Sequence, residues 1–178
     1  MHANESAAVR AAAALIKLLI LDVDGVLTDG GLYYDEDGRV VKRFNVQDGM
    51  GIKLAQAAGL QVAVISGLAS KAVEKRMREL GVTEYHAGFK EKWETVEDIR
   101  QRFGVATHEI AFLGDDWVDA APLLRVGLPL AVANAQPEIK ALAKWISTAQ
   151  GGQGAVREAI CFILDAQGKL DALWQRWI

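Results

Sequence analysis

Residues 18–25 read Leu-Leu-Ile-Leu-Asp-Val-Asp-Gly, a short run of bulky aliphatic residues that ends at two carboxylates. Such a run is typical of a central strand that is buried on both faces. If the chain continues in extended geometry, Asp22 and Asp24 face the same way, because side chains alternate along a strand. When the motif is taken alone, a loop of turn-favouring residues that merely stops the strand explains it about as well.

The pattern of an aliphatic run followed by polar residues returns twice along the chain. Residues 62–65 end at Ser66, and residues 110–113 end before the acidic pair Asp115 and Asp116. Helical spacing is expected from 48 to 59, from 70 to 80, through 93–103 and after 116, and a further strand at 128–132. Strands that alternate with helices in this way indicate right-handed βαβ crossovers. We therefore predict an α/β fold with a doubly wound, mostly parallel, Rossmann-like sheet and helices on both faces.

Two β-prone segments flank a turn signal before the first long helix. Residues 32–34 and 40–44 enclose Asp35-Glu36-Asp37-Gly38, which predicts a small β-hairpin over about 31–44. No segment between the motifs is long enough to form a cap domain. We expect the 178 residues to form a single domain, 1–178, with a short helix before the first strand and a C-terminal tail over about 149–178.

The charge and composition exclude several classes of protein. Twenty Lys and Arg against 23 Asp and Glu leave a net charge of −3 without a basic stripe, so nucleic acid is not an expected partner. No segment has the roughly 20 apolar residues of a membrane span, so we expect no membrane partner. The lone Cys161 cannot form an internal disulfide and lies in an apolar run, as a small buried hydrophobe would. These features indicate a cytoplasmic protein.

The polar residues after the predicted strands are expected to meet at one place. In a parallel sheet of this kind, sites lie at the carboxyl ends of the strands. Two acidic clusters, at Asp22 with Asp24 and at Asp115 with Asp116, would repel each other there without a cation. A hard divalent ion with oxygen ligands relieves that repulsion, and Mg²⁺ suits a site that also binds phosphate. Each acidic cluster taken singly is explained equally well as a turn or a helix cap.

At this point the sequence resembles the haloacid dehalogenase superfamily, whose four motifs match Asp22-Val23-Asp24-Gly25, Ser66, Lys92 and Gly114-Asp115-Asp116 in the right order. Taken alone, Ser66 would be a helix cap and Lys92 a surface residue. Within the superfamily the chain is similar to the capless 3-deoxy-D-manno-octulosonate 8-phosphate phosphatases. The marks of that family are residues 25–30, 44–49 and 151–158, and the resemblance runs from about residue 18 to residue 164.

The resemblance implies a phosphatase that forms an aspartyl-phosphate on Asp22 and uses Asp24 as its acid and base. It implies phosphate binding by Ser66, Gly67 and Lys92, magnesium ligation by Asp22, Asp24 and Asp115, support by Asp116 and Asp119, and substrate contacts from Thr28, Asp29, Gly30, Asn45, Asp48 and Arg157. The family spacing counted from Gly88 selects Lys92 over the nearby Lys90. Leu68 departs from the family, which usually has Arg at this position.

The same resemblance implies the substrate, a phosphorylated sugar acid of lipopolysaccharide precursor synthesis, and Mg²⁺ as cofactor. Because the chain offers no lid, a neighbouring subunit is expected to shield the site from water, in a homo-oligomer that the family makes a tetramer. The alternatives are a phosphatase of another sugar acid, such as a nine-carbon ulosonate 9-phosphate, and a non-catalytic binding module of the same fold. A receiver domain would lack Asp24 and the hairpin.

Overall fold

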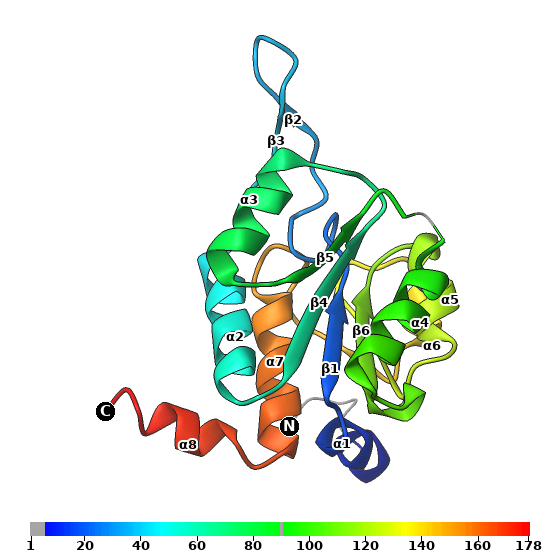
Figure 1. Ribbon diagram of the computed structural model, residues 1–178, viewed down its shortest axis with the longest axis vertical. Helices are drawn as coiled ribbons and strands as arrows, with labels where there is room; N and C mark the ends of the chain where they lie inside the picture. The colour runs from blue at the N-terminus through cyan, green and yellow to red at the C-terminus, as the bar shows by residue number, and fades with distance from the viewer. Residues whose placement is uncertain (1–5, 90) are drawn as a thin grey trace.

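A six-stranded sheet forms the centre of the computed structural model, which describes residues 6–89 and 91–178 (Figure 1). Its strands lie in the spatial order β5 (Glu84–Ala87), β4 (Gln61–Ser66), β1 (Leu18–Leu21), β6 (Ile110–Gly114), β7 (Leu128–Ala131) and β8 (Trp145–Ile146). All neighbouring strands of this sheet pair in parallel. The predicted doubly wound α/β fold is therefore confirmed. Lys90, the alternative lysine of the third motif, lies outside the described residues.

Strand β1 occupies the centre of the sheet because all four of its aliphatic side chains find a buried environment. Its last residue, Leu21, pairs with Val64 of β4 on one side and with Leu113 of β6 on the other. The three strands consequently end at nearly the same level. This register brings the polar residues that follow β1, β4 and β6 to one edge of the sheet.

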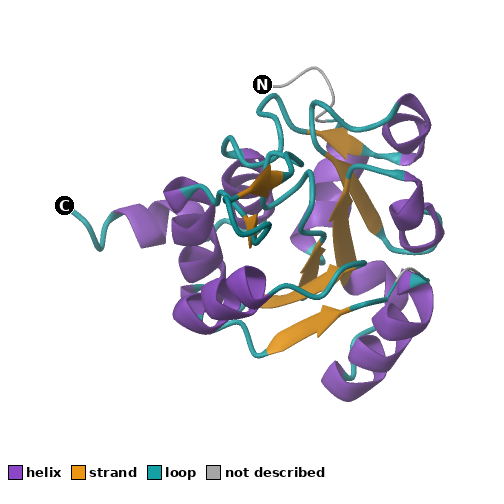
Figure 2. Ribbon diagram, turned by 90° about the horizontal axis from the view of Figure 1, so that it is seen from above, coloured by secondary structure: helices purple, strands orange, loops and turns teal. Residues whose placement is uncertain are grey.

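Helices cover both faces of the sheet (Figures 1 and 2). One layer comprises α1 (Ala7–Ala14), α2 (Val46–Ala57), α3 (Lys71–Leu80) and α7 (Ala155–Ala166), and the other comprises α4 (Lys92–Phe103), α5 (Ala120–Leu123) and α6 (Pro137–Leu142). Two short 3-10 turns, η1 (Thr107–Glu109) and η2 (Trp117–Asp119), precede β6 and α5. Within the described part of the chain, no helix combines the length and the apolar character that a membrane crossing requires.

Helix α7 belongs to the core rather than to a free tail. It buries most of one face, including Ala159, Ile160 and Ile163, and it packs against α2 and α1. Phe162 stacks on the buried Trp145 with ring centroids 5.2 Å apart. The segment expected as a tail thus begins with a core helix, and only the short α8 (Leu170–Trp174) and the residues after it project from the body (Figure 1).

The predicted hairpin is present and short. Strands β2 (Tyr33–Tyr34) and β3 (Val40–Val41) pair antiparallel and extend beyond the body of the molecule (Figure 1). Its apolar side chains are exposed in the single chain, Leu32 at 69% and Tyr34 at 62%. Between β1 and α2 the chain forms only this hairpin and its flanking loops, so no cap domain is inserted there.

Helix α2 begins earlier than expected, and several elements were not predicted, among them β5, β8, α6 and α8. Helix α2 begins at Val46 rather than at residue 48, because the Asn45 side chain accepts a hydrogen bond from the Gln47 N–H and so caps the helix two residues earlier. Strand β5 was not predicted. Its sequence Glu-Tyr-His-Ala has no aliphatic run, and its residues are only half-buried because it forms the edge of the sheet.

Candidate active site

A cavity of about 390 Å³ opens at the carboxyl ends of β1 and its neighbours. It is lined by Asp22, Asp24, Gly67, Leu68, Lys92, Asp115, Asp116 and Val118. Residues from three of the four predicted motifs contribute side chains to this wall, and the motif that contains Ser66 contributes Gly67. The convergence expected from the strand ends is therefore present in the fold.

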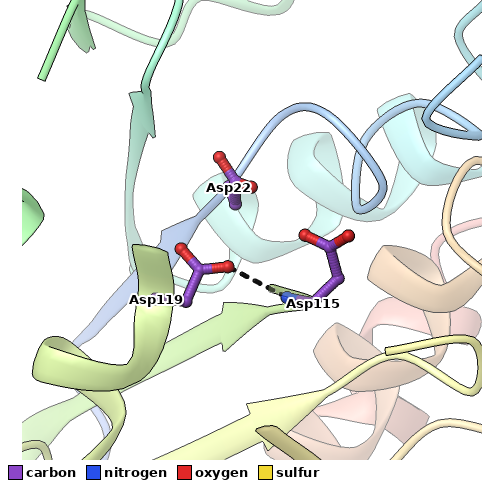
Figure 3. Close-up of side chains that lie close together, drawn as sticks. All are labelled: Asp22, Asp115 and Asp119. Atoms are coloured by element: carbon purple, nitrogen blue, oxygen red, sulfur yellow. Dashed lines mark hydrogen bonds between the residues drawn. The ribbon is translucent and has the colours of Figure 1, made fainter. Parts of the chain in front are cut away.

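Three carboxylates lie close together at this edge of the sheet (Figure 3), and two of them, Asp22 and Asp115, line the cavity. Asp22 follows β1, Asp115 follows β6, and Asp119 ends the turn η2. One carboxylate oxygen from each of them lies within 4.8 Å of the others. Asp22 and Asp119 are buried, so their negative charges are close together in a region of low dielectric.

Lys92 is the cation of this cluster. It begins α4, and its side chain is only 1% exposed. Its Nζ donates to Asp22 Oδ1 at 2.6 Å and to Asp119 Oδ1 at 2.7 Å. A buried ammonium is costly unless it is paired and hydrogen bonded, and both carboxylates meet that need. Lys92 therefore ties the end of β1 to the segment after β6.

Asp119 links this pair to the backbone next to it. Its Oδ2 accepts from the N–H of Asp115 at 2.9 Å and from the N–H of Asp116 at 3.4 Å (Figure 3). Asp116, which was expected to support Lys92 or a metal-bound water, faces solvent at the cavity wall, and it accepts from the Trp117 N–H at 2.7 Å and does not contact Lys92. Since the turn η2 directs the Asp119 side chain inward, Asp119 takes the supporting position next to Lys92.

The cluster carries more negative charge than Lys92 offsets. Burial, together with the nearby charge of Asp119, raises the pKa of Asp22 to about 6 in spite of Lys92. Burial and the charges of Asp22 and Asp119 raise the pKa of Asp115 to about 8. Burial by itself would lower the pKa of Lys92, but the two carboxylates that it contacts raise it overall. Another cation at Asp115 would remove this imbalance.

The surroundings of Asp115 fit a hard divalent cation. Among the described residues, its buried Oδ1 has no hydrogen-bond partner. The backbone of Gly25 lies so close that a Cβ there would be 2.1 Å from Asp115 Oδ2, and Gly25 has a φ of +91°. Carboxylate oxygens without other partners are the ligands that Mg²⁺ prefers. The residues present therefore fit a magnesium ion, and Asp22 and Asp115 would be its side-chain ligands.

Ser66 is buried at the end of β4, where its hydroxyl shapes the following turn. The hydroxyl donates to the Leu68 carbonyl oxygen at 3.0 Å, and its own oxygen accepts from the Leu68 N–H at 3.3 Å. Gly67 and Leu68 extend from this turn into the cavity wall. Phosphate binding by Ser66 and Gly67 stays a prediction, and the turn places both beside the carboxylates.

Thr28, Asp29 and Gly30 shape the loop after β1. The Thr28 hydroxyl donates to the Val23 carbonyl oxygen at 3.3 Å and accepts from the Gly30 N–H at 3.3 Å. Asp29 accepts from the Tyr33 hydroxyl at 2.7 Å, and this hydrogen bond lowers the pKa of Asp29. These residues therefore hold the loop and join it to the base of the hairpin, and none of them lines the cavity.

Asn45 and Asp48 hold the glycine loop at residues 151–154. Asn45 Nδ2 donates to the Gly152 carbonyl oxygen at 3.4 Å. The buried Asp48 accepts from the Gly154 N–H at 3.3 Å and from the Arg157 N–H at 2.9 Å, so it caps the N-terminus of α7. Substrate contact by Asp48 was predicted, but both of its oxygens are engaged with this backbone.

Arg157 lies away from the cavity of its own chain. Its Nε donates to the partly buried Cys161 Sγ at 3.2 Å. Its side chain lines a separate cavity of about 490 Å³ between α2, α7 and α8, together with Met50, Leu54 and Trp174. A contact between Arg157 and substrate would therefore need the site of another subunit.

Lys42 is a site residue that the sequence analysis missed. It follows β3 and forms an ion pair with the Asp24 carboxylate. A lysine in a hairpin of a polar loop region is expected to point to solvent, so composition and spacing contain no signal for this contact. Only the fold of the hairpin over the end of β1 reveals it.

Comparisons with known proteins agree with this geometry. A family model described as haloacid dehalogenase-like hydrolase matches residues 85–160. The 3-deoxy-D-manno-octulosonate 8-phosphate phosphatase of Escherichia coli strain K12 is 43% identical over 166 residues, which are 93% of this chain and 88% of that protein. Its counterpart from Haemophilus influenzae is 42% identical over 154 residues, which are 86% of either chain.

Solved structures extend the likeness to three dimensions. The enzyme of the same name from Moraxella catarrhalis, in complex with a magnesium ion, a phosphate ion and a KDO molecule, has a TM-score of 0.94 at 34% identity, with 99% of this chain and 100% of that one covered. A hypothetical protein from Xanthomonas campestris has a TM-score of 0.94 at 43% identity, with 97% and 94% covered.

We predict that the metal-free protein loses stability as the pH rises from about 5 to 8. The folded-state pKa values of Asp22, about 6, and Asp115, about 8, lie above the ordinary value of 3.8, so the folded chain binds more protons than the unfolded chain over this range. Stability then falls with rising pH. Mg²⁺ should reverse the loss, and its stabilising effect should grow over the same range because it displaces these protons.

The measurement is the melting temperature against pH in EDTA and in Mg²⁺, for wild type and for Asp115→Asn. The variant should show a flatter pH dependence in EDTA and a smaller increase with Mg²⁺. Equal Mg²⁺ stabilisation of wild type and variant at pH 8 would exclude Asp115 as a ligand.

We predict that Asp48→Ala destabilises the fold by about 1–2 kcal/mol, since it removes the cap of α7, whereas Asp48→Asn, which keeps an acceptor oxygen, costs less. Urea unfolding of the two variants tests this. A substrate role would instead appear as an increased KM at unchanged stability.

Proposed function

This chain belongs to the 3-deoxy-D-manno-octulosonate 8-phosphate phosphatase family of the haloacid dehalogenase-like hydrolases, and we propose that it hydrolyses that phosphate to the free sugar acid, with Mg²⁺ as cofactor. The observation that carries the proposal is the buried cluster of Asp22, Lys92, Asp119 and Asp115 at the strand ends. The reaction would belong to lipopolysaccharide precursor synthesis. We propose a cytoplasmic location, supported by a single cysteine that cannot form an internal disulfide.

In the first half-reaction, a carboxylate oxygen of Asp22 attacks phosphorus in line with the leaving oxygen. The bond between phosphorus and the sugar oxygen breaks, and its electron pair stays on the sugar oxygen. Asp24 donates a proton to that oxygen, which releases the free sugar acid and leaves an aspartyl-phosphate. Lys92 supports this step because it holds the Asp22 carboxylate in place at 2.6 Å.

In the second half-reaction, water attacks the phosphorus of the aspartyl-phosphate while Asp24 takes a proton from the water. The bond between phosphorus and the Asp22 oxygen breaks, which restores the carboxylate and releases phosphate. Asp22, Asp115 and the main-chain carbonyl of Asp24 would hold Mg²⁺, which would supply positive charge that offsets the repulsion between phosphate and carboxylates. Ser66, Gly67 and Lys92 bind the phosphoryl oxygens.

One residue bears on the choice among sugar acids. Leu68, which lines the cavity, stands where the family usually has Arg, and an aliphatic side chain cannot pair with the carboxylate that every substrate of this class carries. The alternative substrate is a nine-carbon ulosonate 9-phosphate. Screening both sugar acid phosphates for phosphate release in Mg²⁺ distinguishes the two.

We predict that Asp22→Asn lowers turnover by about three orders of magnitude or more, because an amide is not a nucleophile here. Asp24→Asn should lower it by about 10²–10⁴-fold, since it removes the proton carrier. Phosphate release in Mg²⁺ measures both, with the exposed Asp98→Asn on α4 as the matched control. Substantial activity of Asp22→Asn, or a phosphoryl group trapped on another residue, would exclude Asp22 as the nucleophile.

The proposal includes self-association, as a homotetramer in line with the family resemblance. The apolar side chains exposed on the projecting hairpin, among them Leu32, Tyr34 and Val41, support an interface with a second copy over residues 32–44. A neighbour seated there would shield the open cavity from water. Arg157 of one subunit would then contact the sugar acid that is bound in the site of another.

We predict a mass by light scattering of about four times the 19.3 kDa chain. Leu32→Asp should reduce the mass and the activity together, because it buries a charge in the interface. Leu124→Asp, at a similarly exposed position on the opposite helical layer, is the control. A wild-type monomer that is fully active would contradict the assembly.

A further inference from the structure

The side chain of Lys42 is buried, unlike most of the hairpin to which it belongs. Its side chain is 7% exposed, whereas that of the next residue, Arg43, is 51% exposed. Lys42 thus points inward, whereas residues 31–41 and Arg43 of the same segment are exposed. Burying a lysine costs free energy unless a partner accepts its hydrogen bonds. The partner is Asp24 Oδ1, which lies in the wall of the active-site cavity.

The two lysines of the site contact different members of the catalytic pair Asp22 and Asp24. Lys92 contacts Asp22, together with Asp119, whereas Lys42 contacts Asp24. The nucleophile is therefore held from α4, and the acid and base is held from the hairpin. Lys42 lies 18 residues from Asp24 along the chain, so the ion pair fixes a tertiary arrangement and not a local turn.

A second set of contacts keeps the hairpin base in register with the loop after β1. Asp29 accepts from the Tyr33 hydroxyl at 2.7 Å and lies 3.7 Å from Arg43 Nη1. Tyr33 precedes the hairpin turn and Arg43 follows it. Both legs of the hairpin are consequently tied to the loop that carries Asp24, and the position of Lys42 relative to Asp24 is set by contacts on either side.

We infer that Lys42 is a positioning residue for Asp24. By pairing with Oδ1, Lys42 fixes the plane of the carboxyl group and leaves Oδ2 for proton transfer to the leaving oxygen. The inference rests on the proposed function. It differs from three other roles of a lysine here, namely binding of the phosphate, binding of the sugar acid, and support of the hairpin alone.

The basicity of the leaving group separates these roles. When the bond between phosphorus and the leaving oxygen breaks, phenoxide needs a proton from Asp24 more than 4-nitrophenoxide does, because the nitro group spreads the negative charge. The two aryl esters are otherwise similar in size and lack the sugar acid. The ratio kcat/KM covers the steps up to departure of the leaving group, so it reports on proton donation and not on the later hydrolysis.

The experiment compares wild type and Lys42→Met on phenyl phosphate and on 4-nitrophenyl phosphate in Mg²⁺. For phenyl phosphate we expect kcat/KM to fall by about tenfold to a hundredfold. This is less than the full contribution of general acid catalysis, because Asp24 is still present but no longer held in place. The loss on 4-nitrophenyl phosphate should be several times smaller. Lys42→Arg, which keeps the charge, should restore most of the activity on phenyl phosphate.

Arg39→Met is the matched control, since Arg39 is an exposed cation of the same hairpin that pairs with Asp35 and Asp37 near its tip. This variant should leave kcat/KM unchanged for both esters. In an Asp24→Asn background, Lys42→Met should cost little on phenyl phosphate, because the group that it positions is absent. If Lys42→Met fails to fold by thermal unfolding, Lys42→Gln takes its place in the same comparison.

Each remaining outcome overturns the inference. Equal losses on both aryl esters would assign Lys42 to phosphate binding or to hairpin support. A loss confined to the sugar acid phosphate would assign it to substrate binding, and no loss on any substrate would leave it without a role. Absence of Mg²⁺-dependent phosphate release by the wild type from both sugar acid phosphates and from both aryl esters would instead overturn the proposed function, and the inference with it.

Discussion

Lys92 donates to Asp22 and Asp119 at 2.6 and 2.7 Å while almost none of its side chain reaches solvent. This contact joins β1, α4 and the turn after β6 into one site. Without Lys92, three carboxylates would face one another with no positive charge among them, and protonation would have to neutralise them. With it, an excess of negative charge still remains around Asp115. The same cluster would therefore favour a divalent cation, which in turn would attract an anionic phosphate.

The loops around this site pack against one another through close backbone contacts. Gly151 packs against Gly25 so closely that a Cβ on Gly151 would lie 1.6 Å from the Gly25 carbonyl oxygen. The Gly152 N–H donates to the Val26 carbonyl oxygen at 2.9 Å, and Asp48 caps the helix that follows the glycine loop. Three segments that mark the family in the sequence are therefore in contact in the fold. Their glycines are required because backbone meets backbone there, which leaves no room for a side chain.

The hairpin contacts the active site at its base and is exposed to solvent along the rest of its length. Its exposed apolar side chains are suited to contact a second copy, while Lys42 at its base reaches Asp24. A change in the position of the hairpin would thus act on the acid and base directly. In a fold without a lid, the proposed assembly would thus have a physical route to the active site, because the same short segment would take part in both contacts.

The spatial order of the strands and the edge strands β5 and β8 were not predicted. Strands β1, β4, β6 and β7, their parallel pairing, the convergence of Asp22 and Asp115 and the presence of the hairpin were predictable from the sequence. They follow from short-range patterns of aliphatic, turn-forming and acidic residues, and from the rule that parallel strands present their carboxyl ends at one edge. The motif order also selected Lys92, although a lone lysine carries no such signal.

Only the tertiary structure decided which group each carboxylate contacts. Asp119 and not Asp116 contacts Lys92, Asp48 caps α7, and Lys42 pairs with Asp24. These contacts join residues 18 to 109 positions apart. Local propensity contains no information about such pairs, because they arise from how the helices and the hairpin pack on the sheet and from the need of each buried polar group for a partner.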